Sequence, residues 1–171
     1  MPYFLIVLAV IARIVVHPFN FTPIGAIGLF AGSWCPPRLA WLMPLLALFL
    51  SDLINGFYDP VVMAFVYVGF LGGPLIGQWL LSARRTLPRF GAAVLLAAVF
   101  FFLVSNFGMW LSGIGSYPLT AAGLIECYWA GLPYFRVTLL GDLFYAGLLF
   151  GAAEAANRFF LAQDNDKLRV G

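Results

Sequence analysis

Residues 90–111 read FGAAVLLAAVFFFLVSNFGMWL, an apolar stretch of 22 residues without a charged side chain. A helix needs about 20 apolar residues to cross the hydrocarbon core of a bilayer, so this stretch predicts a membrane-spanning helix. The rest of the chain has the same character, because 63% of its 171 residues are hydrophobic, 9% are charged and the mean hydropathy is +0.98. The 9 Lys and Arg and the 7 Asp and Glu are too few to cover a soluble domain, of which about 25% is normally charged. We therefore predict an integral membrane protein in contact with the lipid bilayer, and exclude a soluble catalytic domain, a nucleotide-binding domain and a nucleic-acid partner.

Five more apolar segments, separated by Pro, Gly and charged residues, accompany this one. The sequence predicts a compact all-α bundle of six transmembrane helices in one domain, residues 1–161, with spans at about 3–16, 23–34, 39–57, 61–81, 90–111 and 136–161. Residues 112–135 are expected to form a long aromatic loop, and residues 162–171 a polar tail. The first segment lacks a basic start and a small-residue cleavage site, so we expect it to remain as a helix rather than serve as a signal peptide.

The positions of Lys and Arg orient this bundle. If successive segments alternate in direction, seven of the nine cations lie on the side of the N-terminus: Arg38, Arg84, Arg85, Arg89, Arg158, Lys167 and Arg169. Cytoplasmic loops of membrane proteins carry the excess of Lys and Arg. Both termini are therefore expected to be cytoplasmic.

Glycines recur every four residues in three of the segments: Gly28 and Gly32, then Gly69, Gly73 and Gly77, then Gly147 and Gly151. This spacing places small residues on one helix face, where another helix backbone can approach closely. We expect these faces to pack within the bundle rather than against a partner.

Polar side chains gather near the opposite, extracytoplasmic ends of the segments. Ionisable groups are costly inside a membrane, so each is a candidate functional residue. The candidates for binding a substrate are His17, Asn20, Asp52, Asn55, Tyr58, Asn106, Arg136 and Asp142. Two interpretations remain open: a pocket for a small-molecule solute, with aromatic walls and a few orienting polar groups, or buried ion pairs that only stabilise the fold. The residues of such pairs would be Arg13, Asp52, Arg136 and Asp142.

No enzyme activity is expected. His17 is the only histidine in the sequence, which has neither an HExxH zinc motif nor a P-loop glycine pattern. No resident cofactor is expected, and the two cysteines are too few for a thiolate metal site. His17 or Cys127 is instead a candidate ligand for a metal that a solute carries.

Four segments of the chain resemble a known family. Residues 17–26 (HPFNFTPIGA), 50–53 (LSDL), 105–113 (SNFGMWLSG) and 136–142 are similar to the signature segments of a family of small uncharacterised bacterial inner-membrane proteins. More distantly, six helices with an outward-facing polar cluster resemble the substrate-binding S components of energy-coupling factor (ECF) transporters, the cobalamin-transporting members above all. That resemblance implies the bacterial inner membrane as the location. It also implies that His17, Asp52, Tyr67 and Arg136 surround a substrate pocket.

The same resemblance implies uptake of a vitamin-like solute, with a corrinoid as the best single candidate. Because the chain encodes no ATP site, an ECF coupling subunit and its ATPases would supply the energy. The alternative is a non-enzymatic scaffold or assembly subunit of a larger membrane complex, with glycine-lined helix faces that dock on its partners.

Overall fold

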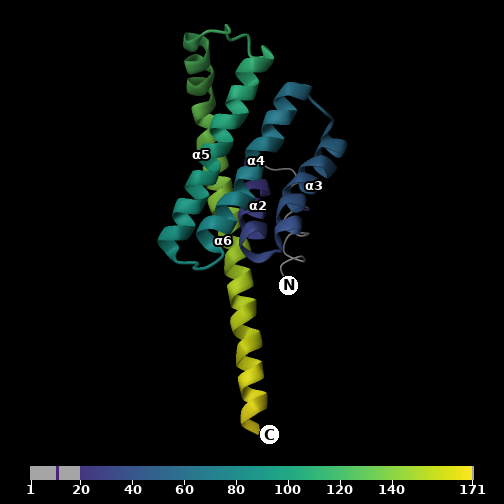
Figure 1. The fold of residues 1–171 in the computed structure, drawn as a ribbon, viewed down its shortest axis with the longest axis vertical. Coiled ribbons are helices and arrows are strands. Elements are labelled where there is room, and N and C mark those ends of the chain that lie inside the picture. The colour runs from purple at the N-terminus through teal and green to yellow at the C-terminus, as the bar shows by residue number, and fades with distance from the viewer. Residues whose placement is uncertain (1–10, 12–19, 171) are drawn as a thin grey trace.

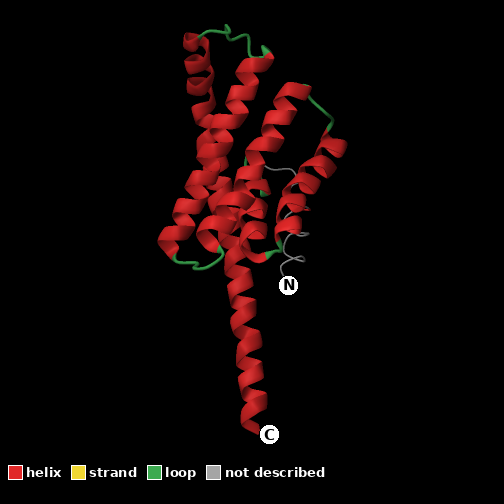
Figure 2. Cartoon of the chain, in the orientation of Figure 1, coloured by secondary structure: helices red, strands yellow, loops and turns green. Residues whose placement is uncertain are grey.

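The computed structural model describes residue 11 and residues 20–170, and this part of the chain is all-helical (Figures 1 and 2). The helices are α2 (Ile24–Trp34), α3 (Pro37–Asn55), α4 (Pro60–Leu81), α5 (Leu87–Ser112) and α6 (Ala121–Val170). Four helical stretches are long and apolar enough to cross a membrane, namely α3, α4, α5 and the part of α6 that ends at Phe159. The all-α prediction is therefore confirmed.

The predicted count of six spanning helices is not matched by the described residues. These form five helices, and α2 has only 11 residues, about 16 Å at 1.5 Å per residue. That length covers about half of a 30 Å hydrocarbon core. The span expected at 3–16 lies outside the described residues, apart from Ile11.

The four long helices run between two ends of the bundle (Figure 1). The lower end holds the turns at residues 35–36 and 82–86, and the upper end holds the turns at 56–59 and 113–120. Helix α2 lies in the centre, where it contacts all four other helices. Ten of its 11 residues are buried, as expected for a helix that is apolar on every side.

Glycines allow α2 and α4 to pack closely. A Cβ atom at Gly32 would lie 2.3 Å from the carbonyl oxygen of Pro74, and one at Gly77 would lie 2.3 Å from that of Leu29. The predicted packing of these glycine faces within the bundle is thus confirmed. Around Gly147 on α6, by contrast, no described atom lies within 4 Å of an added Cβ.

The last helix differs from the prediction. It begins at Ala121 and continues through Pro133 to Val170, so the expected loop at 112–135 shrinks to residues 113–120 and the expected tail is helical. The reason is that residues 119–132 are mostly apolar, with Glu126 as their one charged residue, and contain no proline. A proline is tolerated inside a membrane helix when neighbouring groups satisfy the carbonyl that it frees.

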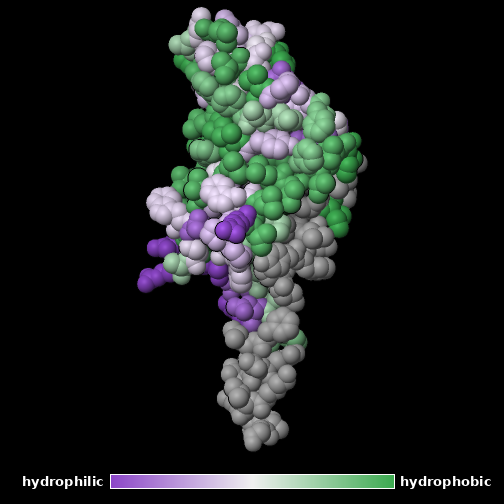
Figure 3. All heavy atoms as spheres, turned by 45° about the vertical axis from the view of Figure 1, so that its right-hand side comes forward, coloured by the Kyte–Doolittle hydropathy of each residue, from purple (hydrophilic) through white to green (hydrophobic). Residues whose placement is uncertain are grey.

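The surface separates apolar from polar groups along the bundle. Hydrophobic atoms cover much of the upper part in the view of Figure 3, and hydrophilic atoms gather towards the lower end. The cations of the described residues whose side chains are placed there are Arg38, Arg84, Arg85, Arg89 and Arg158. Helix α6 continues downward from that end (Figure 1). The two turns of the upper end contain no Lys or Arg.

Candidate functional site

The N-terminal end of α2 lies inside the bundle and faces a carboxylate. Pro23 precedes the helix and provides no side-chain cap, so the first backbone amides of α2 lack a partner within the helix. The side chain of Asp142, on α6, lies against this end and is only 3% exposed. Its Oδ1 atom is 2.3 Å from the position that a Cβ of Gly25 would take, and the backbone amide of Ala26 is close enough to interact with it. The sequence Ile24-Gly25-Ala26 therefore leaves room for a carboxylate from another helix.

This contact is deep in the bundle. Twelve residues of α6 separate Asp142 from Glu154, or about 18 Å at 1.5 Å per residue. Glu154 marks the lower end, because it pairs with Arg85 of the turn at 82–86. A hydrocarbon core about 30 Å thick that begins at this lower end would have Asp142 and the start of α2 near its middle.

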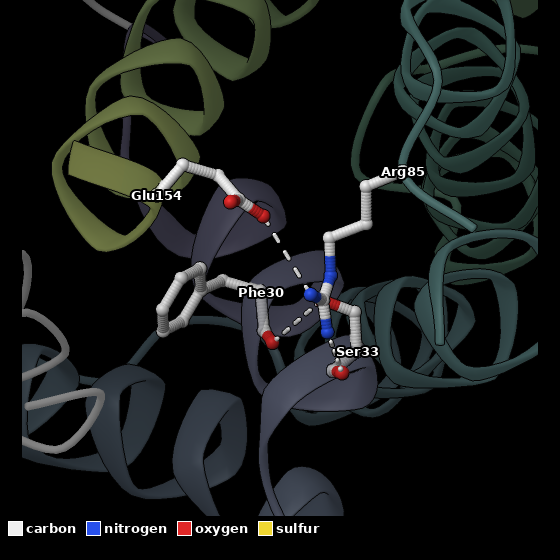
Figure 4. A network of polar contacts seen from close by, with 4 residues as sticks. All are labelled: Phe30, Ser33, Arg85 and Glu154. Atoms are coloured by element: carbon white, nitrogen blue, oxygen red, sulfur yellow. Dashed lines mark hydrogen bonds and ion pairs between the residues drawn. The ribbon is translucent and has the colours of Figure 1, made fainter. Parts of the chain in front are cut away.

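The opposite end of α2 is neutralised by a cation (Figure 4). Arg85 donates a hydrogen bond of 3.0 Å from Nη2 to the carbonyl oxygen of Ser33. Its Nη1 lies 3.6 Å from Oε1 of Glu154, and its guanidinium carbon lies 4.0 Å from the centroid of the Trp34 ring. A cation is favourable where the last carbonyls of a helix lack partners. Helix α2 is thus held with a carboxylate at its N-terminus and a guanidinium at its C-terminus, both from other parts of the chain.

A second buried carboxylate lies on the other side of α2, in α3. Asp52 is 4% exposed, and its Oδ2 accepts a hydrogen bond of 2.9 Å from the hydroxyl of Tyr67 on α4. Fifteen residues separate Asp52 from the start of α3, which places it about 22 Å above the lower end. The structure thus brings together Asp52 and Tyr67, two of the four residues that the resemblance to ECF S components placed around a pocket.

A small polar cavity lies between α5, α6 and the turn before α2. It has a volume of about 30 Å³, close to the share of one water molecule in the liquid. Its polar lining residues are Asn20, Ser105, Asn106, Tyr134 and Thr138. Asn20 has a left-handed backbone conformation with φ of 64°, which Asn tolerates better than most residues.

Hydrogen bonds fix two of the polar side chains around this cavity. The Asn106 side-chain amide donates to the carbonyl oxygen of Phe102 at 2.8 Å, and the Thr138 hydroxyl donates to that of Tyr134 at 3.0 Å. Each of these bonds uses the donor of its side chain. The Oδ1 of Asn106 and the hydroxyl oxygen of Thr138 can therefore still accept a hydrogen bond.

Three of the other predicted site residues are exposed, namely Asn55, Tyr58 and Arg136. Tyr58 is near enough to Tyr67 for an electrostatic interaction, and His17 lies outside the described residues. Cys127 is buried, with its sulfur 3.4 Å from the carbonyl oxygen of Asn106. No group of three potential metal ligands occurs among the described residues.

The ion pairs considered from the sequence are likewise not formed by the residues described. The ion pair that the structure describes joins Arg85 to Glu154, and Arg13 lies outside the described residues. Asp52 and Asp142 therefore have hydrogen-bonding or backbone partners in the described part of the chain, but no cationic one. Two buried carboxylates, together with the amides and hydroxyls of the bundle, can bind a polar solute, a proton or a water molecule.

Residues 1–164 match the model of a family described as a family of unknown function (DUF6580), and the chain belongs to that family. The match includes every residue of the site described above. No curated protein and no solved structure shows significant similarity to the chain.

Proposed function

We propose that this member of the DUF6580 family is a non-enzymatic, solute-binding membrane protein of S-component type that takes up a vitamin-like solute. The observation that carries the proposal is the start of a buried, half-length helix near the middle of the membrane, with Asp142 facing it. Discontinuous helices that end at the bilayer midplane form the substrate sites of many transporters. Ionisable residues at this depth commonly mark the pathway of a substrate or an ion.

Polar groups from three other helices that pack around α2 add to the proposal. Asp52 and Tyr67 contribute a hydrogen-bonded pair from α3 and α4, while Asn106 contributes an amide from α5. A solute that enters from the upper end would pass the exposed side chains of Tyr58 and Arg136 first. We propose that the upper end is extracytoplasmic, since the cations at the lower end favour the cytoplasm of a bacterial inner-membrane protein.

The size of the cavity limits how a vitamin could bind. Sites for such molecules have volumes of about 300–1,000 Å³, whereas the described cavity has about 30 Å³. Binding of a vitamin-like solute therefore requires α5 and α6 to separate from the turn before α2. A corrinoid is the first compound to test, with His17 or Cys127 as a candidate ligand to its cobalt, and an ECF coupling subunit with its ATPases as the energy source.

Mass spectrometry of small molecules retained by the purified protein tests this proposal. We expect a stoichiometric solute that the wild-type protein retains and that Asp52→Asn and Asn106→Ala lose. Glu126→Gln is the matched control, because Glu126 is an exposed carboxylate on α6. Equal retention by all variants would contradict the site. If the protein neither retains a solute through purification nor binds one that is added, the proposed function would be contradicted.

A scaffold subunit is the second candidate, and one observation favours it. Gly147, Gly151 and Ala155 recur every four residues along α6, and all three are exposed. Such a strip can accept another membrane helix. A stoichiometric protein partner in mild detergent that Gly151→Leu abolishes, without a copurifying solute, would favour the scaffold over the solute-binding protein.

A further inference from the structure

The surroundings of Asp142 differ from those of a carboxylate in a structural ion pair. Its side chain is 3% exposed, and the helices that pack against α6 are α2 and α5. Between them, α2 and residues 90–112 of α5 contain no titratable side chain. On α6 itself, Tyr145 and Arg136 are the nearest titratable residues in sequence, and the side chain of Arg136 is exposed. His17 lies outside the described residues. No cation of the described chain neutralises Asp142.

The N-terminal end of α2 stabilises the ionised form of this carboxylate. Pro23 has no N–H, and the amide of Ile27 bonds to the Pro23 carbonyl oxygen at 2.8 Å. The amides of residues 24–26 therefore have no partner within the helix, and the helix dipole at this end also favours a negative charge. The carboxylate lies directly against them, as the 2.3 Å distance from Oδ1 to a Cβ built on Gly25 indicates.

A metal cation does not fit this place as well as a proton does. Amide N–H groups present positive charge, while hard metal cations need several oxygen ligands around them. The described residues hold no cluster of three potential metal ligands. A proton needs neither additional ligands nor additional space, since it joins a carboxylate oxygen directly.

Polar residues of α6 follow Asp142 towards the upper part of the bundle. Tyr134, Thr138 and Asp142 follow one another at intervals of four residues, so they lie on one face of α6. The cavity of about 30 Å³ is lined by the first two of these and by Asn20 and Asn106. A volume of this size, with several polar neighbours, suits a water molecule.

We propose that Asp142 is a proton-binding residue, loaded from the upper side through the cavity next to Thr138. A water molecule in the cavity gives its proton to the carboxylate and regains one from the solution at the upper end. In the ionised state the first amides of α2 hold the carboxylate, and in the protonated state this attraction is weaker because the carboxyl group has lost its charge. Asp142 binds the proton whether or not a vitamin-like solute is the cargo.

Infrared difference spectroscopy of the protein in lipid nanodiscs tests the site directly. Aspartate labelled with ¹³C separates the bands of the Asp carboxyl groups from those of Glu126 and Glu154. We expect a labelled carboxylic-acid band that appears on acidification and exchanges slowly in D₂O. This slow band should disappear in Asp142→Asn and persist in Asp52→Asn. An identical set of bands in the wild type and Asp142→Asn would overturn the proposal.

Two further variants test the route and guard against misfolding. Thr138→Val should slow the hydrogen–deuterium exchange of the slow band about tenfold, the effect of losing one hydrogen bond, whereas Ser82→Ala at the lower end should not. Unchanged exchange in Thr138→Val would overturn the assigned route. If Asp142→Asn does not fold, Asp142→Glu should move the slow band from the labelled aspartate region to the glutamate region, and a failure to move it would overturn the proposal.

Discussion

Replacement of Gly77 by Ala should force α2 and α4 apart. The added Cβ would lie 2.3 Å from the carbonyl oxygen of Leu29, whereas ordinary contact begins at 3.4 Å, so the two helices must separate by about 1 Å. Both partners are backbone, and α2 is enclosed by four helices, so no flexible side chain can absorb the shift. Overpacking of this kind costs about 1–3 kcal/mol, partly offset by the better helix propensity of Ala, about 1 kcal/mol.

Gly147→Ala is the matched control for this prediction. It makes the same chemical change in a membrane-spanning helix, but no described atom lies within 4 Å of the added Cβ. The difference between the two variants therefore isolates the steric cost, about 2 kcal/mol, which corresponds to an apparent Tm about 4–8 °C lower for Gly77→Ala in a chain of this size.

The assay is thermal denaturation in detergent, with the remaining monodisperse fraction measured by size-exclusion chromatography. Gly32→Ala should behave like Gly77→Ala, because its Cβ would lie 2.3 Å from the carbonyl oxygen of Pro74. Equal midpoints for Gly77→Ala and Gly147→Ala would refute the close contact between α2 and α4.

Three more predictions follow from single contacts. Arg85→Ala should lower stability by about 1–2 kcal/mol because it removes a charged hydrogen bond to the end of α2, while Arg89→Ala, an exposed arginine with no described partner, should leave the melting midpoint unchanged. Tyr67→Phe should cost about 1–2 kcal/mol because it takes away the hydroxyl that bonds buried Asp52, and a midpoint equal to that of the wild type would argue against the bond. Burial raises the pKa of the Cys35 thiol, so less thiolate is present at neutral pH. Alkylation of Cys35 by iodoacetamide should therefore be slower than that of a model thiol and should accelerate only at higher pH. Alkylation as fast as that of a model thiol at pH 7 would contradict the burial.

The sequence predicts the long helices well because their signal is local. The span expected at 90–111 is found within α5, Leu87–Ser112, since an uncharged apolar run of that length has few alternatives. The start of α6 was predicted 15 residues too late. The helix was predicted to begin at Arg136, but in the structure it begins at Ala121 and Pro133 lies inside it.

The central place of α2 depends on information that is not local. A segment that is apolar on all sides has the same sequence pattern whether it crosses the membrane or ends halfway inside a bundle. The contacts at its two ends come from Asp142 and from Arg85, which is 52 residues from Ser33 in the chain. Spacing alone does not reveal such partners. The glycine at position 25 was evident from the sequence, but the space that its missing Cβ leaves for a carboxylate becomes evident only in three dimensions.

Cryo-electron microscopy of the protein in lipid nanodiscs, with an antibody fragment bound for alignment, would test the start of α2 at mid-membrane depth most directly. The lipid density defines the bilayer midplane independently of the protein. We expect α2 to begin near that plane, with the Asp142 carboxylate against the amide of Ala26. A helix that begins at a membrane surface, or an Asp142 side chain that faces the lipid, would contradict both the proposed solute site and the proton-binding residue.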